Sequence, residues 1–552
     1  MHDPYQLSIF QGSLDVYAPM IDAMLKQLTK QRVVERLWQG DPSLWHPSSA
    51  TQARIRTRLG WLSLAPTMPD TLLKTRLWVE SLRAREYIHL VCIATDEASG
   101  VVRLWRDMHP AGEDQIQLHL LDLPDASLVQ SIIASLDWQH TMVLIAAAEL
   151  SPELNALTNI VLDAYEQAMP EECVVVVVTA EESEVARWAK DCPPIQLLTF
   201  GADIRARFGA LSPLGLVIAT LLGYDLSQLH NQTQTMQAVC ERAEMLESNP
   251  GVYLGTVLGV CAQQGRDKLT FIAAPELEPF ASWSGNLVGG ALSKHRRGLV
   301  PIVGESWGDA ASYRHDRLFV LLQYKDRRDA AMEAHVAALR QAGHPVLTLW
   351  FRGGEALAAH ILLWQVAVCI AAVIIGVNPF DEPDADALRA YINDQKALNH
   401  AVETLQGPFG HSVLAAQLRN VVSLLGQAEY VVLIPYLSQS GNVVGQLRVL
   451  RTLLLDRWQL PTVVVEPLRD ATVATQLLHA GRSNGMMLAF AAMPPDQAVL
   501  GAPQGLDAYI RMRLAADTAA WRSMGRPHFV LNLGQHPLQM LQWCNAELMT
   551  MP

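Results

Sequence analysis

The sequence predicts an α/β protein in which mainly parallel β-sheets are covered by helices. Short runs of β-branched and other apolar residues recur along the chain, and helical patterns separate them. Strands that are apolar throughout, without alternation, are typical of parallel sheets buried on both faces. Strands that alternate with helices predict a layered α/β architecture. The strand runs form two clusters, at roughly 85–205 and 265–470, which indicates two α/β subdomains.

The elements follow in order from these runs. The first 80 residues show helical patterns and carry Trp38, Trp45 and Trp61, which we expect to pack on the first sheet. The strands are then predicted wherever an apolar, β-branched run is bounded by turn residues or helical patterns. The clearest predicted strands are 88–95, 142–147, 173–179, 269–274, 318–322, 346–350, 430–434 and 462–465.

The chain of 552 residues is too long for one compact domain. A Gln-rich helical stretch at 226–248, closed by an Asn-Pro-Gly turn, separates the two strand clusters. We therefore predict a helical segment at 1–80, a first α/β subdomain at 81–235, and a second subdomain with a C-terminal extension at 236–552.

The composition excludes several classes of protein. Half of the residues are apolar and 18% are charged, so the chain can bury a sizeable core and is not a disordered or low-complexity protein. The net charge of −13 predicts no basic face for a nucleic acid. The seven cysteines are scattered without Cys-x-x-Cys pairs, so neither a disulfide framework nor a zinc site is predicted. We expect no metal and no other cofactor.

The chain is expected to be soluble and cytoplasmic. Its first ten residues lack the basic segment and apolar segment of a signal peptide. The stretch 361–377 is membrane-like, but it contains Gln365, has about the minimum length for spanning a bilayer, and runs into a Pro-Asp-rich turn. We predict a buried core helix there and no membrane partner.

Seven peptides, in order along most of the chain, resemble the phosphoglucose isomerase family, most closely the isomerase domain of bacterial transaldolase/phosphoglucose isomerase fusions. The most specific are RARFGALSPLGLV at 205–217 and GVNPFDEPD at 376–384. The resemblance implies two sugar-isomerase (SIS) subdomains, each a three-layer αβα sandwich, and a homodimer. The other peptides are VVERLWQGDPSLWHP (33–47), RLGWL (58–62), NPGVYLG (249–255), GRDKLTF (265–271) and GLVPIVGESWGD (298–309).

The resemblance also implies a reaction, the movement of a proton between C1 and C2 of glucose 6-phosphate through an enediolate. Such a reaction needs a phosphate cradle, a carboxylate base, a ring-opening histidine, and cations near the developing oxyanion. Because a fold does not imply a function, each part has to be found separately in this sequence.

The two loops that match the family's phosphate cradle have lost most of its groups. In the family, the first loop reads like GMGGSS, whereas here 94–99 reads ATDEAS, so both central glycines are replaced. The second family loop is rich in serine and threonine, whereas 146–152 keeps a hydroxyl only at Ser151 and gains Glu149.

This exchange disfavours a bound phosphate. A phosphomonoester carries about −1.5 to −2 charges near pH 7. The loss of three or four hydrogen bonds to it costs roughly 5–10 kcal/mol, and Asp96, Glu97 and Glu149 add repulsion. Two interpretations of these acidic residues are open: a solvated helix start, where such residues are favoured, or a site rebuilt for a cation or a neutral ligand. Either one removes the phosphate site.

The family's catalytic base is also missing. Counting back from Lys294, which matches the family's lysine, the base position holds Gly290, whose side chain has no proton acceptor. Removal of a general base typically costs about 10²–10⁴-fold in rate. Glu305 is no relocated base, because the family has a glutamate in that loop as well. The resemblance places Ser151, Glu382 and Lys294 among the substrate-binding residues.

Four residues are the residual catalytic candidates. Arg207 matches the family's active-site arginine, although it fits a structural arginine bonded to loop carbonyls equally well. Arg389 replaces the family's catalytic lysine and keeps its charge but not its compact ammonium group. His360 lies near the expected ring-opening residue, although a lone histidine beside an apolar helix is more often structural. His479 is retained in the late family loop.

Three hypotheses follow. The first is a phosphoglucose-isomerase-like protein of sugar-phosphate metabolism that has lost catalysis and serves as a scaffold, subunit or regulator. The family context implies a pentose-phosphate enzyme, such as transaldolase or glucose-6-phosphate dehydrogenase, as its partner. The second is an active aldose–ketose isomerase, interconverting glucose 6-phosphate and fructose 6-phosphate with a rearranged site. The third is a binding module for an uncharged or cationic metabolite.

Overall fold

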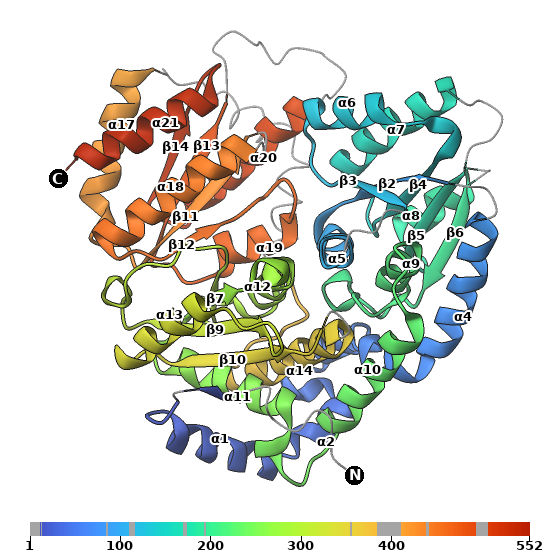
Figure 1. Ribbon diagram of the computed structural model, residues 1–552, viewed down its shortest axis with the longest axis horizontal. Helices are drawn as coiled ribbons and strands as arrows, with labels where there is room; N and C mark the ends of the chain where they lie inside the picture. The colour runs from blue at the N-terminus through green and yellow to red at the C-terminus, as the bar shows by residue number, and fades with distance from the viewer. Residues whose placement is uncertain are drawn as a thin grey trace.

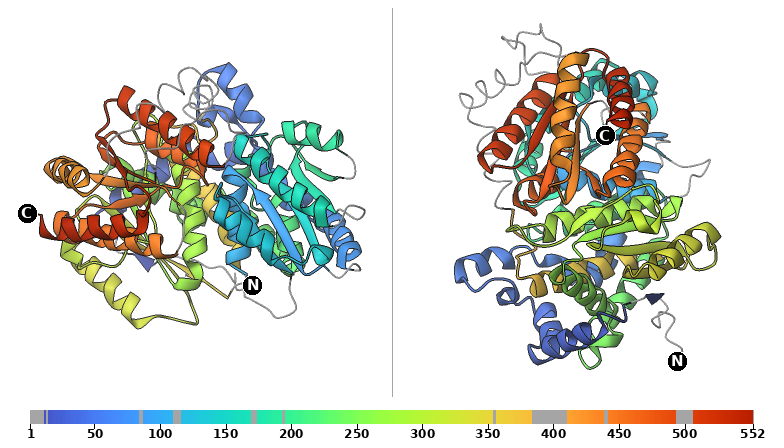
Figure 2. Two further views of the ribbon diagram at one scale, coloured as in Figure 1. Left: turned by 90° about the horizontal axis from the view of Figure 1, so that it is seen from above. Right: turned by 90° about the vertical axis from the view of Figure 1, so that its left-hand side faces the viewer.

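The computed structural model describes residues 11–12, 14–83, 87–109, 116–168, 174–192, 195–353, 356–382, 410–437, 441–492 and 506–551. Figure 1 shows three groups of strands with helices around them, and Figure 2 shows that α1 and α21 lie at opposite ends of the molecule. The N-terminal helices are α1 (Ala18–Lys30), α2 (Val33–Trp38), α3 (Ser49–Arg56) and α4 (Leu64–Arg83).

The first sheet is entirely parallel, with strand order β3-β2-β4-β5-β6. Its strands are apolar on both faces because helices cover both. Leu90 and Cys92 pack with the core under α5 and α9, whereas Val91 and Ile93 pack with α6, α7 and α8. The elements are β2 (His89–Ala94), α5 (Asp96–Asp107), β3 (Gln117–Leu121), α6 (Ala126–Ser135), β4 (Thr141–Ala146), α7 (Pro152–Ala168), β5 (Val175–Ala180), α8 (Glu184–Lys190), β6 (Gln196–Phe200) and α9 (Pro213–Leu221).

The second sheet has the order β1-β10-β9-β7-β8, and only β1 is antiparallel to its neighbour. The helices α10 (Leu226–Cys240) and α11 (Pro250–Gln263) lead into it. The other elements are β1 (Gln11–Gly12), β7 (Lys268–Ala273), α12 (Glu278–Leu292), β8 (Val300–Ile302), β9 (Arg317–Tyr324), α13 (Ala330–Gln341), β10 (Val346–Phe351) and α14 (Leu357–Ile375).

Helix α14 is the membrane-like stretch, and it lies in the protein core as predicted. Among the described residues it is the one helix long and apolar enough to cross a membrane, and 94% of its most apolar window is buried. Glycines of α11 allow the two helices to pack closely. A Cβ on Gly255 would lie 2.4 Å from the carbonyl oxygen of Ala367, so a larger residue does not fit there.

The third sheet is parallel, with order β12-β11-β13-β14. Val431 and Leu433 of its central strand face α17, α18 and α21, whereas Val432 and Ile434 face α19 and α20, which gives a three-layer sandwich. Its elements are α17 (His411–Leu425), β11 (Tyr430–Tyr436), α18 (Gly441–Trp458), β12 (Thr462–Val464), α19 (Ala471–Thr475), β13 (Gly485–Ala491), α20 (Leu506–Ser523), β14 (His528–Asn532) and α21 (Pro537–Thr550).

The predicted fold class is confirmed, since mainly parallel sheets lie between helices. All of the predicted strands are found, within a few residues of their predicted ends. The sequence analysis placed all strands after residue 265 in one cluster, whereas the structure divides them between the second and third sheets. The two sheets adjoin where β8 contacts β12. The domain boundaries near 80 and 235 stay predictions.

The three tryptophans expected to pack on the first sheet make their described polar and stacking contacts with helices and a turn, and the packing of the N-terminal segment on that sheet stays a prediction. Trp38 donates to the carbonyl oxygen of Cys240 at the end of α10, and Trp45 donates to that of Cys369 in α14. Trp61 stacks on Phe208. Trp38 and Trp45 therefore bond to the helices α10 and α14, whereas Trp61 contacts the turn between β6 and α9. Helix α4 is the described part of the N-terminal segment that lies beside the first sheet, at β6.

Candidate functional site

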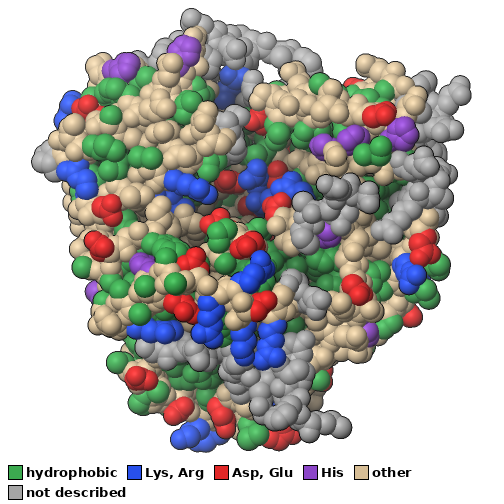
Figure 3. Space-filling view, in the orientation of Figure 1, with side chains coloured by type: hydrophobic (Ala, Val, Ile, Leu, Met, Phe, Trp, Pro, Cys, Tyr) green, Lys and Arg blue, Asp and Glu red, His purple; other side chains and the backbone are tan. Residues whose placement is uncertain are grey.

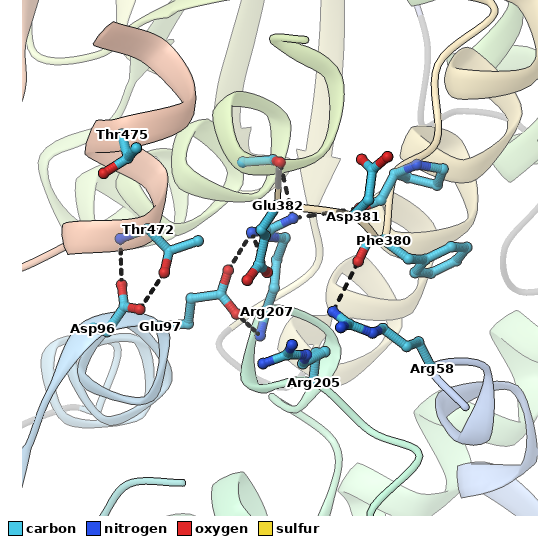
Figure 4. A network of polar contacts seen from close by, with 12 residues as sticks. Arg58, Asp96, Glu97, Arg205, Arg207, Phe380, Asp381, Glu382, Thr472 and Thr475 are labelled. Carbon is cyan, nitrogen blue, oxygen red and sulfur yellow. Dashed lines mark hydrogen bonds and ion pairs between the residues drawn. The ribbon is translucent and has the colours of Figure 1, made fainter. Parts of the chain in front are cut away.

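Arg207 lies at the centre of a buried polar network between the first sheet and α12 (Figure 4). It sits in a short 3-10 turn between β6 and α9, and its side chain is 4% exposed. One terminal nitrogen, Nη1, donates to the carbonyl oxygens of Gly290 at 2.8 Å and Pro379 at 3.3 Å. The turn, α12 and the loop after α14 therefore converge on one guanidinium.

Two buried carboxylates hold the other side of Arg207. Its Nη2 pairs with Glu382 at 3.0 Å and with Glu97, whose Oε2 also accepts the Arg207 backbone N–H at 3.3 Å. Burial alone would lower the pKa of Arg207, but Glu97 and Glu382 more than offset it and the pKa is raised. Burial would raise the pKa of Glu382, yet Arg207, Arg205 and Arg58 bring it below its usual range. The network is thus held in its ionised form.

The Arg207 side chain fills the space in front of Gly290. A Cβ at position 290 would lie 2.6 Å from Nε and 2.8 Å from Cζ of Arg207. Contacts this short do not occur between real side chains, so any side chain at this position would displace the guanidinium. The packing of Arg207 therefore requires a glycine at 290.

Asp96 links the network to the third sheet. It is the first residue of α5, with φ of 53°, and its carboxylate accepts the backbone N–H of Thr472 at 2.7 Å and the Thr472 hydroxyl. Thr472 lies in the first turn of α19, so Asp96 caps a helix of another part of the chain. Burial and the charge of Glu97 raise the pKa of Asp96 to about 7, against the lowering effect of the Thr472 hydrogen bonds.

Lys294 is completely buried behind Gly290 on the chain that follows α12. Its Nζ donates to the carbonyl oxygens of Asn378, at 2.8 Å, and Asp381, and to the Asp381 carboxylate at 3.0 Å. Burial and the nearby Arg207 lower the pKa of Lys294 to about 8, while Asp381 opposes that change. All three ammonium N–H groups have acceptors within the chain.

This arrangement is a closed ionic network in which the carboxylates face the chain's own cations and a helix N-terminus. Such a network can fix the loops against one another, and the side chains of Glu97, Arg207, Glu382 and Lys294 at its centre are buried. Among the described residues, no group of three or more His, Cys, Asp or Glu side chains is placed to hold a metal ion.

The chain is similar to proteins named glucose-6-phosphate isomerase. It is 25% identical over 327 residues to the probable enzyme of Haloquadratum walsbyi, covering 51% of this chain and 75% of that protein. It is 22% identical over 314 residues to the enzyme of Rubrobacter xylanophilus, covering 49% of this chain and 72% of that one. No protein-family model matches the chain.

This chain is phosphoglucose-isomerase-like. Solved structures agree at the level of the fold. The glucose-6-phosphate isomerase of Chlamydia trachomatis superposes with a TM-score of 0.50 at 14% identity, covering 73% of this chain and 89% of that one. The hypothetical protein TT0462 of Thermus thermophilus superposes with a TM-score of 0.59 at 18% identity, covering 70% of this chain and all of that one.

In this phosphoglucose-isomerase-like chain, the interpretation of Asp96 and Glu97 as a solvated helix start is wrong. Glu97 is 9% exposed at its side chain and pairs with Arg207, and Asp96 bonds to Thr472. Glu97 of the first loop faces a cation of the chain itself. The other interpretation, a site rebuilt for a cationic or neutral ligand, stays a prediction. Glu149 of the second loop lies 3.9 Å from Arg205.

Three of the residues predicted for substrate binding have structural partners. Glu382 and Lys294 belong to the network around Arg207. Ser151 lies at the start of α7, where its hydroxyl accepts the backbone N–H of Leu154 at 3.3 Å, as in a helix cap. Their predicted roles in binding a substrate stay predictions.

The two candidate histidines lie apart from Arg207. His360 is buried in α14 and stacks on Phe351 at 3.8 Å between ring centroids, and burial lowers its pKa to about 4. His479 lies beneath the third sheet, with Nε2 3.4 Å from Asp517. No described contact joins either ring to the guanidinium of Arg207. Arg389 lies outside the described residues.

Glu305 has a structural position, in line with its rejection as a relocated base. It pairs with Arg317 at 2.9 Å and accepts the backbone N–H of Thr462 at 3.3 Å. Its partners lie in the second and third sheets, and no described contact links it to Arg207.

Sequence reasoning missed Arg58, Arg205 and Thr472. Arg58 donates to the carbonyl oxygen of Phe380 at 2.9 Å, and both arginines act on the pKa of Glu382. Arg58 and Arg205 stand inside two of the peptides that carry the family resemblance, RLGWL and RARFGAL, so their position was a usable signal. The sequence around Thr472 carried no such signal, because the contact of Thr472 with Asp96 joins residues far apart in the sequence.

Proposed function

We propose that this chain is a glucose-6-phosphate isomerase-like protein of cytoplasmic sugar-phosphate metabolism that has lost catalysis and acts as a scaffold, subunit or regulator. The single observation that carries this proposal is the placement of Arg207. Its two terminal nitrogens are bonded to Glu97, Glu382 and the carbonyl oxygens of Gly290 and Pro379, and its side chain occupies the place of a base at position 290.

Electrostatics supports the same proposal. A sugar phosphate that enters beside α5 meets the carboxylates of Asp96 and Glu97 in place of glycine N–H groups. To free Arg207 for an oxyanion, two buried carboxylates would have to lose their partner, and breaking a buried ion pair costs about 3–5 kcal/mol. Catalysis needs the opposite arrangement, with donors preorganised toward the developing charge.

The alternative is an active aldose–ketose isomerase with a rearranged site, and one observation favours it. Lys294, whose pKa is lowered to about 8, lies close to Arg207 and Glu382, as a proton-transferring lysine would. However, its three N–H groups are bonded to residues of the loop after α14. The arrangement therefore suits a structural lysine better.

A coupled assay separates the two functions. The protein is purified from a host strain without its own phosphoglucose isomerase and supplied with glucose 6-phosphate, and fructose 6-phosphate is measured by a coupling enzyme. We expect no turnover above that of the coupling enzyme alone. Turnover that survives purification and disappears in Arg207→Ala, while circular dichroism shows a folded variant, would establish the active isomerase.

The partner of the proposed scaffold is a pentose-phosphate enzyme, such as transaldolase or glucose-6-phosphate dehydrogenase, and the chain itself forms a homodimer. Both parts rest on the family resemblance. Light scattering after gel filtration measures the oligomeric state, and co-elution with each purified enzyme tests the partner. A monomer that co-elutes with neither enzyme would contradict this part of the proposal.

A further inference from the structure

A cavity of about 350 Å³ lies where the carboxyl ends of β7 and β8 meet β12. In open α/β sheets, ligands bind outside the carboxyl ends of the strands, and cavities of a few hundred Å³ hold small metabolites. Figure 3 shows basic side chains beside a hollow near the centre of this face. The cavity shares no lining residue with the network around Arg207, and its lining includes Phe271, Trp307, Val444, Arg448 and Arg451.

Arg451 is a buried guanidinium without a carboxylate of its own. It comes from α18, is 5% exposed, and lines the cavity. Its Nε donates to the Thr462 hydroxyl at 2.9 Å, and its Nη atoms donate to the carbonyl oxygens of Gly304, Val303 and Thr462 at 2.7–3.0 Å. These four acceptors are neutral, and one of the five N–H groups of the guanidinium has no described partner.

The charge around Arg451 is unbalanced. Glu305, the carboxylate whose charge acts on Arg451, is already paired with Arg317 at 2.9 Å, so two buried guanidiniums share this carboxylate. Burial, together with the charges of Arg317 and Arg448, lowers the pKa of Arg451 to about 10, and Glu305 opposes this change. Buried charges without a partner are costly, and a bound anion would supply the missing charge.

The rest of the lining includes three more arginines, four carboxylates and an apolar wall. Two of these arginines, Arg103 and Arg469, are paired with Asp470 and Glu466. Arg448 lies one turn before Arg451 on α18, is exposed, and has no ion pair with any described residue. Trp307 is 45% exposed and stacks on His335 at 5.4 Å. Val444 and Leu447 of α18 complete an apolar side. Two arginines beside an indole face suit an anion with an apolar body.

We propose that this cavity is a binding site for a small organic anion, in which Arg448 and Arg451 hold a carboxylate or phosphate group and the body of the ligand lies against Trp307. The site does not depend on the loss of isomerase activity, because the two sites share no residue. A ligand bound at this site would be independent of the family's substrate.

Isothermal titration calorimetry of the full chain tests the site. The probes are phenyl phosphate, benzoate, inorganic phosphate and, as an uncharged control, benzyl alcohol. We expect saturable binding of phenyl phosphate or benzoate, and the stronger of the two identifies the anionic group. Arg448→Glu should weaken that binding by about tenfold or more, because a hydrogen bond to a charged group is replaced by repulsion.

Arg448 is chosen because it is exposed and its side chain has no hydrogen bond or ion pair with a described residue, whereas Arg451 also ties α18 to the loop after β8. The matched control is Arg522→Glu, an exposed arginine of α20 outside the cavity, which should keep wild-type affinity. The proposal is overturned if neither organic anion binds saturably, if Arg448→Glu binds as tightly as wild type, or if benzyl alcohol binds as well as benzoate.

Discussion

Arg207 is a guanidinium held at the centre of a buried ionic network. It is shared by two buried carboxylates, Glu97 and Glu382, and the excess negative charge is offset by Arg58, Arg205 and Lys294 around it. Buried ion pairs of this kind contribute little when compared with apolar packing, but they are expensive to break. Sequence reasoning placed Arg207 at the site and left open whether it was structural. Its partners favour the structural interpretation.

The first prediction is that Arg207→Ala destabilises the chain by about 3–5 kcal/mol, because two buried carboxylates lose their partner. Urea unfolding with an unchanged m-value measures the loss. The control is Arg32→Ala, since Arg32 is 70% exposed and its pair with Glu35 should contribute only about 0–1 kcal/mol. Equal effects of the two substitutions would mean that the network does not stabilise the folded state.

The second prediction concerns Gly290. The substitution Gly290→Ala should cost about 1–3 kcal/mol, because the new methyl group displaces the Arg207 side chain. Gly445→Ala is the control, since Gly445 lies in α18 with no atom within 4 Å of the added Cβ, and alanine is the better helix former. Thermal melting of both variants checks the difference. A Gly290→Ala variant as stable as wild type would refute the packing argument.

Among the secondary-structure elements, the N-termini of α5 and α19 are joined by the hydrogen bonds of one acidic side chain. Asp96 begins α5 and caps α19, so the two helix N-termini face each other across a carboxylate. Both dipoles favour a negative charge there, but burial and Glu97 oppose it. The outcome is a carboxyl group that titrates near neutral pH.

The third prediction is a pH dependence. A carboxyl group whose folded pKa is raised from 3.8 to about 7 binds more protons in the folded state, so its contribution to stability falls as the pH rises through that range. Asp96→Asn removes this titration and keeps an oxygen acceptor for Thr472. Wild type should therefore lose stability relative to Asp96→Asn as the pH is raised from about 4 to 7. A constant difference across that range would contradict the assignment.

The sequence predicted elements more reliably than their partners. The strands at 142–147 and 318–322 were found because short, β-branched and apolar runs bounded by polar residues are typical of buried strands. The edge strands β3 and β6 were missed, because the polar residues His119 and Thr199 interrupt their apolar runs. The caps and ion pairs of Asp96 and Glu97 were missed for another reason: they depend on residues more than a hundred positions away.

At the scale of the whole molecule, charged side chains join the first sheet to the third. Arg103 of α5 pairs with Asp470 and lies 3.4 Å from Asp122, which in turn lies 3.1 Å from Arg469. Together with the Asp96–Thr472 contact, these pairs hold α19 against α5. The arrangement of the subdomains is therefore fixed by polar contacts across their boundary, which no local pattern in the sequence reveals.

The fourth prediction tests that joint. Arg103→Met keeps the aliphatic length but leaves Asp122 and Asp470 without this partner, so the backbone amides of α19 should exchange with solvent about tenfold faster or more, as for a loss of about 1.4 kcal/mol in local stability. Hydrogen exchange with mass spectrometry measures the rate. Arg106→Met on the same helix is the control, since its pair with Asp107 is about one-third exposed. Equal exchange in both variants would show that Arg103 does not hold the two helices together.

We propose that no group among the described residues is placed to move a proton on a sugar phosphate. Incubation of glucose 6-phosphate with the purified protein in D₂O, followed by NMR at C2, tests it directly, because an enediolate mechanism lets the base exchange its proton with solvent. We predict no deuterium at C2 beyond that in a protein-free sample. Deuterium that accumulates with wild type and vanishes with a folded Arg207→Ala variant would contradict the claim.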